Sequence, residues 1–89
     1  MYRVELTPRA QRGLDDIGGK ELERILTAIE KLGETPRPHG KRKLRGPIHR
    51  IRLGDWRIIY AVFDKDKLVL VGKIARRSER TYDKVDELF

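Results

Sequence analysis

Residues 48–63 read IHRIRLGDWRIIYAVF, and this stretch predicts the centre of the fold. Within residues 48–53, His49, Ile51 and Leu53 alternate with Arg50 and Arg52, which is the period of a strand with two different faces. Gly54 and Asp55 then make a two-residue turn of the Gly-X type. The residues after the turn, WRIIYAVF, are apolar on both faces apart from one arginine. The stretch therefore predicts a β-hairpin whose second strand is central in a sheet and covered on both sides.

A third strand is predicted downstream of this hairpin. Residues 64–67 (DKDK) turn the chain, and residues 68–75 (LVLVGKIA) are again rich in strand-forming residues. Gly72 interrupts that strand in a way typical of a β-bulge. The three consecutive strands form an antiparallel meander.

Upstream, the sequence predicts a strand followed by two helices. Residues 2–6 alternate apolar and polar side chains. Thr7 can cap a helix and Pro8 suits the first helical position, so a short helix follows and ends at a Gly-Gly pair. A second helix is predicted over about residues 20–32, where apolar side chains recur at helical spacing. This helical hairpin must lay its apolar stripe on the sheet, and the first strand joins the sheet beside a member of the meander.

The remaining segments complete one domain, residues 1–89. Residues 40–46 are basic and are predicted to form a loop. Ser78 can cap a short final helix on which Tyr82 belongs to a narrow apolar edge. The predicted order is β-α-α-β-β-β-α, an α+β domain in which the helical hairpin packs on a small, mainly antiparallel four-stranded sheet.

Composition excludes several classes of protein. The chain has no cysteine, which excludes disulfides and thiolate metal sites and fits the cytoplasm. No apolar run approaches the roughly 20 residues that span a membrane. The nucleotide-binding patterns GxxxxGK[ST] and GxGxxG and the zinc motif HExxH are absent. His39 and His49 have no partner at ligand spacing, so we expect neither a metal nor a cofactor.

The positive charge is concentrated in one segment. Residues 37–57 contain eight Lys or Arg and one acid, which equals the net charge of +7 of the whole chain. A local excess of this size favours a polyanionic partner over a merely solvated face.

Four arginines and a tyrosine are the candidates for chemistry. Arg50 and Arg52 project from the same face of one strand. Arg57 begins the next strand, with its facing left open, Arg76 ends the strand after that, and Tyr82 follows on the final helix. These elements can place four guanidinium groups around one surface, and guanidinium groups bind phosphate bidentately. Tyr82 can donate a hydrogen bond, stack on a base, or pack the helix on the sheet.

The chain resembles the RelE/ParE superfamily of toxins from bacterial and archaeal toxin–antitoxin pairs. The similarity covers YRVELTPRA, the helical hairpin, LRGPIHRIRLGDWRIIYAVFD and KIARRSERTY. Its most specific part is a basic strand, a short turn and then an aromatic residue, arginine, two aliphatic residues and tyrosine, present here as IHRIRLGDWRIIY. The RelE branch is more similar than the ParE branch. The resemblance implies a RelE-like microbial ribonuclease-type fold.

This resemblance implies a ribosome-dependent endoribonuclease that inhibits translation. RelE-type toxins enter the ribosomal A site, where the ribose 2′-OH of the messenger RNA attacks the adjacent phosphate and leaves a cyclic phosphate and a 5′-OH. By the same resemblance, Arg50 and Arg52 activate the 2′-OH and stabilise the phosphate. Arg57 binds phosphate, Arg76 assists the leaving 5′ oxygen, and Tyr82 stacks on or orients the substrate.

The sequence departs from the family pattern at two places. Lysines are usual where this chain has Arg50 and Arg52, and arginine is a poor general base. The site therefore acts by electrostatic stabilisation alone, or a tyrosine or His49 takes the proton, or the activity is weak. The alternation, however, places His49 on the opposite face of its strand. The register of the last arginine is also open among Arg76, Arg77 and Arg80, with Arg77 the first alternative to Arg76.

The resemblance also implies partners. Lys41, Arg42, Lys43 and Arg45, together with Arg77, suit contacts with ribosomal RNA phosphates. A separately encoded, acidic antitoxin would form a hetero-oligomer with the toxin and hold it inactive. The sequence leaves two alternatives to a nuclease: a ParE-like toxin that inhibits DNA gyrase without catalysis, and a plain RNA-binding module.

Overall fold

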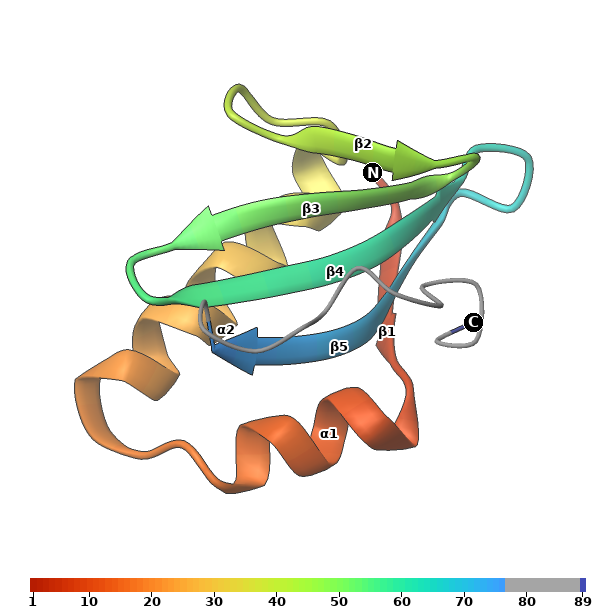
Figure 1. Ribbon diagram of the computed structural model, residues 1–89. Coiled ribbons are helices and arrows are strands. Elements are labelled where there is room, and N and C mark those ends of the chain that lie inside the picture. The colour runs from red at the N-terminus through yellow and green to blue at the C-terminus, as the bar shows by residue number, and fades with distance from the viewer. Residues whose placement is uncertain (77–88) are drawn as a thin grey trace.

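The fold consists of one strand, two helices and four further strands, and the computed structural model describes residues 1–76 and 89. The elements are β1 (Arg3–Leu6), α1 (Pro8–Asp15), α2 (Gly19–Glu34), β2 (Arg42–Arg45), β3 (Ile48–Leu53), β4 (Trp56–Phe63) and β5 (Leu68–Arg76). They form one sheet of order β1-β5-β4-β3-β2 (Figure 1). β1 is parallel to β5, and the other neighbouring strands are antiparallel.

The predicted hairpin and meander are confirmed. β3 and β4 have the predicted bounds, and β4 is the middle strand of the sheet. Gly54 in the turn has φ of 60°, a conformation that glycine adopts without strain. The bulge is confirmed as well, because Ile59 pairs with Lys73 and Tyr60 with Val71, which leaves Gly72 between the two pairs.

The prediction of a four-stranded sheet is wrong. The segment predicted as a basic loop, residues 40–46, contains β2, which adds a fifth strand at the edge beside β3. Its sequence, RKLR, has a single apolar residue and so carries no two-sided strand pattern. Charged residues are common on edge strands, which have a neighbour on only one side. The predicted final helix falls on residues 77–88, outside the described part of the chain.

Local signals set the helix boundaries. Thr7 caps α1, since its Oγ1 accepts a hydrogen bond from the amide of Ala10 at 3.2 Å. The same hydroxyl donates to the carbonyl oxygen of Gly72 at 3.0 Å and so ties the start of α1 to the bulge. α2 continues two residues beyond the predicted end. Gly33 near its end lies against β1, where a Cβ would be 2.9 Å from the carbonyl oxygen of Tyr2.

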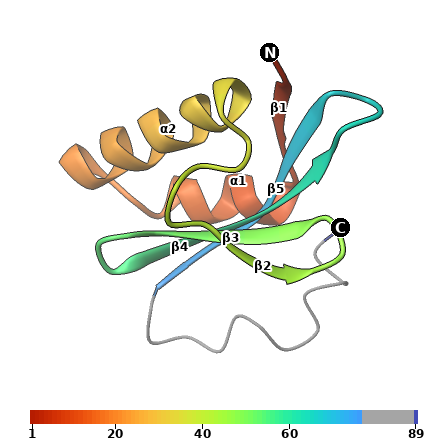
Figure 2. The same cartoon turned by 90° about the horizontal axis from the view of Figure 1, so that it is seen from above.

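Both helices cover the same face of the sheet (Figure 2). The main core lies between the helices and the sheet and contains Ile25, Leu32, Ile58, Tyr60 and Val71, all at most 1% exposed. No helix in residues 1–76 is long and apolar enough to cross a membrane.

A second, smaller apolar cluster lies on the opposite face of the sheet. Ile48, Ile59 and Ala61 are its buried members, and Phe63 and Phe89 pack against them. We call the sheet surface that carries Ile59 the second face.

Candidate nucleic-acid interface

Strand register places three of the predicted arginines on the second face. Arg50 is directly opposite Ile59, and Arg52 is directly opposite Arg57. Side chains of directly opposite residues in an antiparallel pair project from the same face. The prediction that Arg50 and Arg52 share a face is therefore confirmed. Arg57, whose facing periodicity left open, projects from the same face.

These three arginines differ in exposure. Arg50 is 7% exposed, Arg57 is half-buried and Arg52 is exposed. The Nε atoms of Arg50 and Arg57 are shielded from solvent, and both residues also interact with other groups of the protein. A guanidinium that is partly withdrawn from water attracts an anion more strongly than a fully solvated one. The arrangement therefore suits a phosphate approached by one exposed and two recessed cations.

Lys73 belongs to the same surface, and the sequence did not reveal it. It is directly opposite Ile59 on β5, so one row across the sheet reads Arg42, Arg50, Ile59, Lys73. Simple alternation from Leu68 would turn Lys73 toward the helices. The bulge at Gly72 reverses the alternation and turns Lys73 to the second face instead. We call Arg42, Arg50, Arg52, Arg57 and Lys73 the cationic face.

Arg76 does not lie on the cationic face, so its predicted convergence with the other arginines is wrong. It is directly opposite Trp56, which packs against the main core on the helix side. The Arg76 guanidinium carbon lies 4.9 Å from the centroid of the Trp56 ring, a cation–π contact. The indole Nε1 of Trp56 in turn donates to Glu21 Oε2 at 3.1 Å. The physical reason is again the bulge, without which alternation from Leu68 would place Arg76 on the second face.

The remaining predicted positions fall on β2 or outside the described residues. Arg42, Lys43 and Arg45 are exposed on β2, and Lys41 is half-buried just before it. Their strand borders β3, and Arg42 on it is itself a member of the cationic face. Tyr82 and Arg77 fall in residues 77–88, outside the part of the chain that the structure describes.

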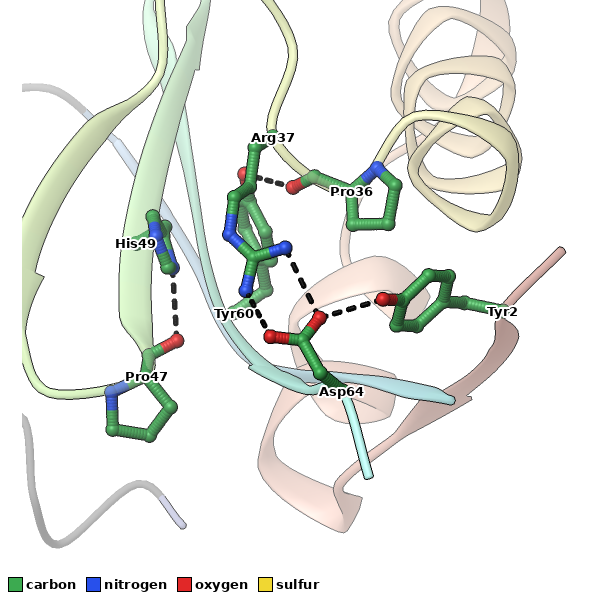
Figure 3. A network of polar contacts seen from close by, with 7 residues as sticks. All are labelled: Tyr2, Pro36, Arg37, Pro47, His49, Tyr60 and Asp64. Carbon is green, nitrogen blue, oxygen red and sulfur yellow. Dashed lines mark hydrogen bonds and ion pairs between the residues drawn. The ribbon is translucent and has the colours of Figure 1, made fainter. Parts of the chain in front are cut away.

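His49 and Tyr60 form a buried pair on the helix side of the sheet. Their rings stack with centroids 5.7 Å apart, and His49 Nδ1 lies 2.8 Å from the carbonyl oxygen of Pro47 (Figure 3). The Tyr60 hydroxyl donates to the carbonyl oxygen of Pro36 at 2.8 Å. Burial lowers the pKa of His49 and raises the pKa of Tyr60 to about 12. The prediction that His49 faces away from the arginines is confirmed, and both residues are separated from the cationic face by the sheet.

Arg37 is neutralised by a carboxylate distant in sequence. Its guanidinium donates to Asp64 Oδ1 at 3.1 Å and Oδ2 at 2.7 Å, and the Tyr2 hydroxyl donates to the same Oδ1 at 2.6 Å (Figure 3). The hydrogen bonds from Arg37 and Tyr2 hold the pKa of Asp64 below its usual range, and the bond from Arg37 has the larger effect. They join the segment after α2 to the turn between β4 and β5. Arg37 therefore contributes to the architecture rather than to the cationic face.

Replacing Tyr60 with phenylalanine tests the buried phenol through pH. The Tyr60 pKa lies above the unfolded value of 10.0, at about 12, so the unfolded chain releases the proton first and stability falls as pH rises through this window. By pH 11.5 the wild type should lose about 2 kcal/mol relative to the variant, as the linkage relation gives for a shift of this size. Urea unfolding of both proteins from pH 8 to pH 11.5 measures the difference. Parallel curves would show that Tyr60 titrates normally.

Comparison with known proteins identifies a family. The family described as ParE toxin of type II toxin–antitoxin system, parDE, matches residues 4–81. A protein named "Putative toxin RelE1" from Methanocaldococcus jannaschii is 31% identical over 81 residues, which covers 85% of this chain and 90% of the relative.

Solved structures share the fold. The archaeal RelE–RelB complex from Pyrococcus horikoshii contains a chain that is 29% identical, with a TM-score of 0.76, and the match covers 89% of this chain and 98% of that one. The isolated E. coli RelE toxin matches over the full length of both chains with a TM-score of 0.77 and 22% identity, which establishes likeness of fold.

Proposed function

The chain belongs to the RelE/ParE superfamily of toxins of type II toxin–antitoxin pairs, and from this premise we propose that it is a ribosome-dependent endoribonuclease. In this proposal it cleaves messenger RNA in the ribosomal A site and thereby inhibits translation. The 2′-OH attacks the neighbouring phosphorus, which yields a cyclic phosphate and a 5′-OH.

The observation that carries the proposal is the common facing of Arg50, Arg52 and Arg57. Phosphodiester cleavage adds negative charge to the phosphate oxygens in the transition state, and fixed guanidinium groups stabilise that charge. A guanidinium stays protonated, so these residues supply charge and orientation rather than proton exchange.

The basic edge strand supports ribosome binding in this proposal. Arg42 belongs to the cationic face, and Lys43 and Arg45 are exposed on the same edge strand, where cations can contact ribosomal RNA phosphates without reading bases. The ribosome then positions the message, so the protein needs only part of an active site of its own. Lys41 and Arg77 are assigned to the same contact surface by their place in the sequence.

An antitoxin is the second partner that we propose. Solved relatives are named as complexes of RelE with RelB, and a cationic face of this kind attracts an acidic segment. Such a segment would mask the arginines and keep the toxin inactive in the cytoplasm as a hetero-oligomer.

Mapping of messenger RNA 5′ ends tests the function. The toxin is induced alone, and ends are compared for one message with an intact start codon and for the same message with that codon removed. We expect cuts inside codons only on the translated message. Equal cutting of both messages would refute ribosome dependence. Growth arrest without cuts would favour the alternative of a ParE-like toxin that inhibits DNA gyrase. The family that matches this chain is described as ParE toxin, which is why this alternative is included.

A further inference from the structure

We propose that Lys73 is a catalytic residue of this nuclease, and that its ammonium group donates the proton to the leaving 5′ oxygen. This inference rests on the proposed function and extends it to a side chain that neither the sequence pattern nor the family resemblance indicates.

The position of Lys73 follows from the bulge in β5. The family resemblance assigns leaving-group assistance to an arginine at the end of the last strand, but Arg76 lies on the helix side against Trp56. The cation that β5 does present to the second face is Lys73. It stands two strands from Arg50, a backbone separation of about 10 Å, with Ile59 between them. Long side chains on either side of Ile59 can therefore converge on one phosphodiester.

Proton exchange distinguishes Lys73 from the other members of the cationic face. Those members are all arginines, and a guanidinium does not release its proton, whereas an ammonium can. Among the side chains that strands β1–β5 present to the second face, one other besides Lys73 can exchange protons, the carboxylate of Glu5. Glu5 on β1 is directly opposite Leu70 on β5, and its Oε2 forms an ion pair with Arg3 Nε at 3.0 Å.

The surroundings of Lys73 suit an acid. From β4, Ile59 lies directly opposite it and Arg57 lies on the diagonal, and from β1 Glu5 lies one row away. Phe89 covers the adjacent Gly72 and packs on the second apolar cluster. Lys73, half-buried, therefore marks the border between the apolar and cationic halves of the second face. At this border the Lys73 side chain is partly withdrawn from water by its apolar neighbours.

The chemical step balances without any further group. The 2′ oxygen forms a bond to phosphorus while its proton passes to water. The bond between phosphorus and the 5′ oxygen breaks, and that oxygen takes a proton from the Lys73 ammonium. The neutral amine then regains a proton from solvent. Arg50, Arg52 and Arg57 stabilise the phosphate charge throughout.

A substrate with a sulfur atom at the leaving position tests this role. Ribosomes are programmed with RNA that carries either oxygen or sulfur at the bridging 5′ position of the phosphate cut by the wild type. A thiolate leaves without protonation, because its pKa is several units below that of an alcohol. With oxygen, Lys73→Met and Lys73→Arg should each slow cleavage about 100-fold, the scale of general acid catalysis. With sulfur, both should return to within a few-fold of wild type. Lys65→Met, an exposed turn variant with the same change of charge, should cut both substrates at the wild-type rate.

Three outcomes would overturn the assignment. Wild-type cleavage by Lys73→Arg would show that charge alone is needed. An equal defect of Lys73→Met on both substrates would show that the lysine does not protonate the leaving group. Sulfur rescue of Arg77→Ala together with full activity of Lys73→Met would give the role to Arg77. Failure of the wild type to cut either RNA would instead refute the proposed function, so the two failures are distinguishable.

Discussion

Replacing Arg57 with alanine should slow messenger RNA cleavage about 100- to 1000-fold, the cost of removing one fixed donor to an oxyanion, whereas Arg76→Ala should cleave at close to the wild-type rate. Arg57 lies directly opposite Arg52 on the second face, half-buried, where it can contact the phosphate. Arg76 is exposed on the helix side and stacks on Trp56. Its loss should cost stability of about 0.5–1 kcal/mol, the value of an exposed cation–π contact.

The two variants are compared in the translated-message assay and by growth after induction. Thermal unfolding of both proteins controls for folding, and Arg57→Gln, which keeps much of the side-chain packing, is included because Arg57 is partly buried. Loss of cleavage in Arg76→Ala with activity retained in Arg57→Ala would contradict the placement of the active surface on the second face.

Removing the charge of β2 should weaken ribosome binding and make it less sensitive to salt. Replacing Arg42, Lys43 and Arg45 with glutamine removes three phosphate contacts. The slope of log K against log salt should become shallower by about 2 to 3. If binding at 1 M salt is unchanged, affinity at 0.1 M should fall by about two to three orders of magnitude. Binding to purified ribosomes across a salt series measures both quantities.

A triple variant on the helix side provides the matched control. Arg9, Arg12 and Lys20 are exposed on α1 and α2, and their replacement by glutamine lowers the net charge by the same amount. This control should alter the slope much less, because long-range attraction depends on net charge whereas counterion release depends on contact. Equal slopes for the two triple variants would show that β2 has no special contact with the ribosome.

The arrangement of the hairpin and of the first helix could be predicted because its signals are local. The turn at Gly54 requires a backbone conformation that glycine provides, and it joins two segments of opposite strand pattern. Thr7 and Pro8 start α1 within one helical turn of the residues that they position. The common face of Arg50 and Arg52 follows from the period of two in a strand, which no distant contact is needed to establish.

Sequence did not predict β2, because an edge strand needs only one partner and can be charged on all sides. The sequence also did not predict that Arg37 would pair with a carboxylate and so not contribute to the cationic face, because its partner Asp64 lies 27 residues away along the chain. Both facts depend on where distant segments meet.

Sequence by itself determined that this protein has a central hairpin carrying a basic strand, a helical hairpin to cover it and a bulge-prone glycine in the last strand. The tertiary structure alone decided which cations share a surface. The bulge at Gly72 is tied to α1 by Thr7 and covered by Phe89, whose ring would lie only 2.6 Å from a Cβ added at Gly72. A single extra residue reverses the alternation beyond it, because successive side chains of a strand point to opposite faces. For that reason Lys73 faces the arginines and Arg76 faces away.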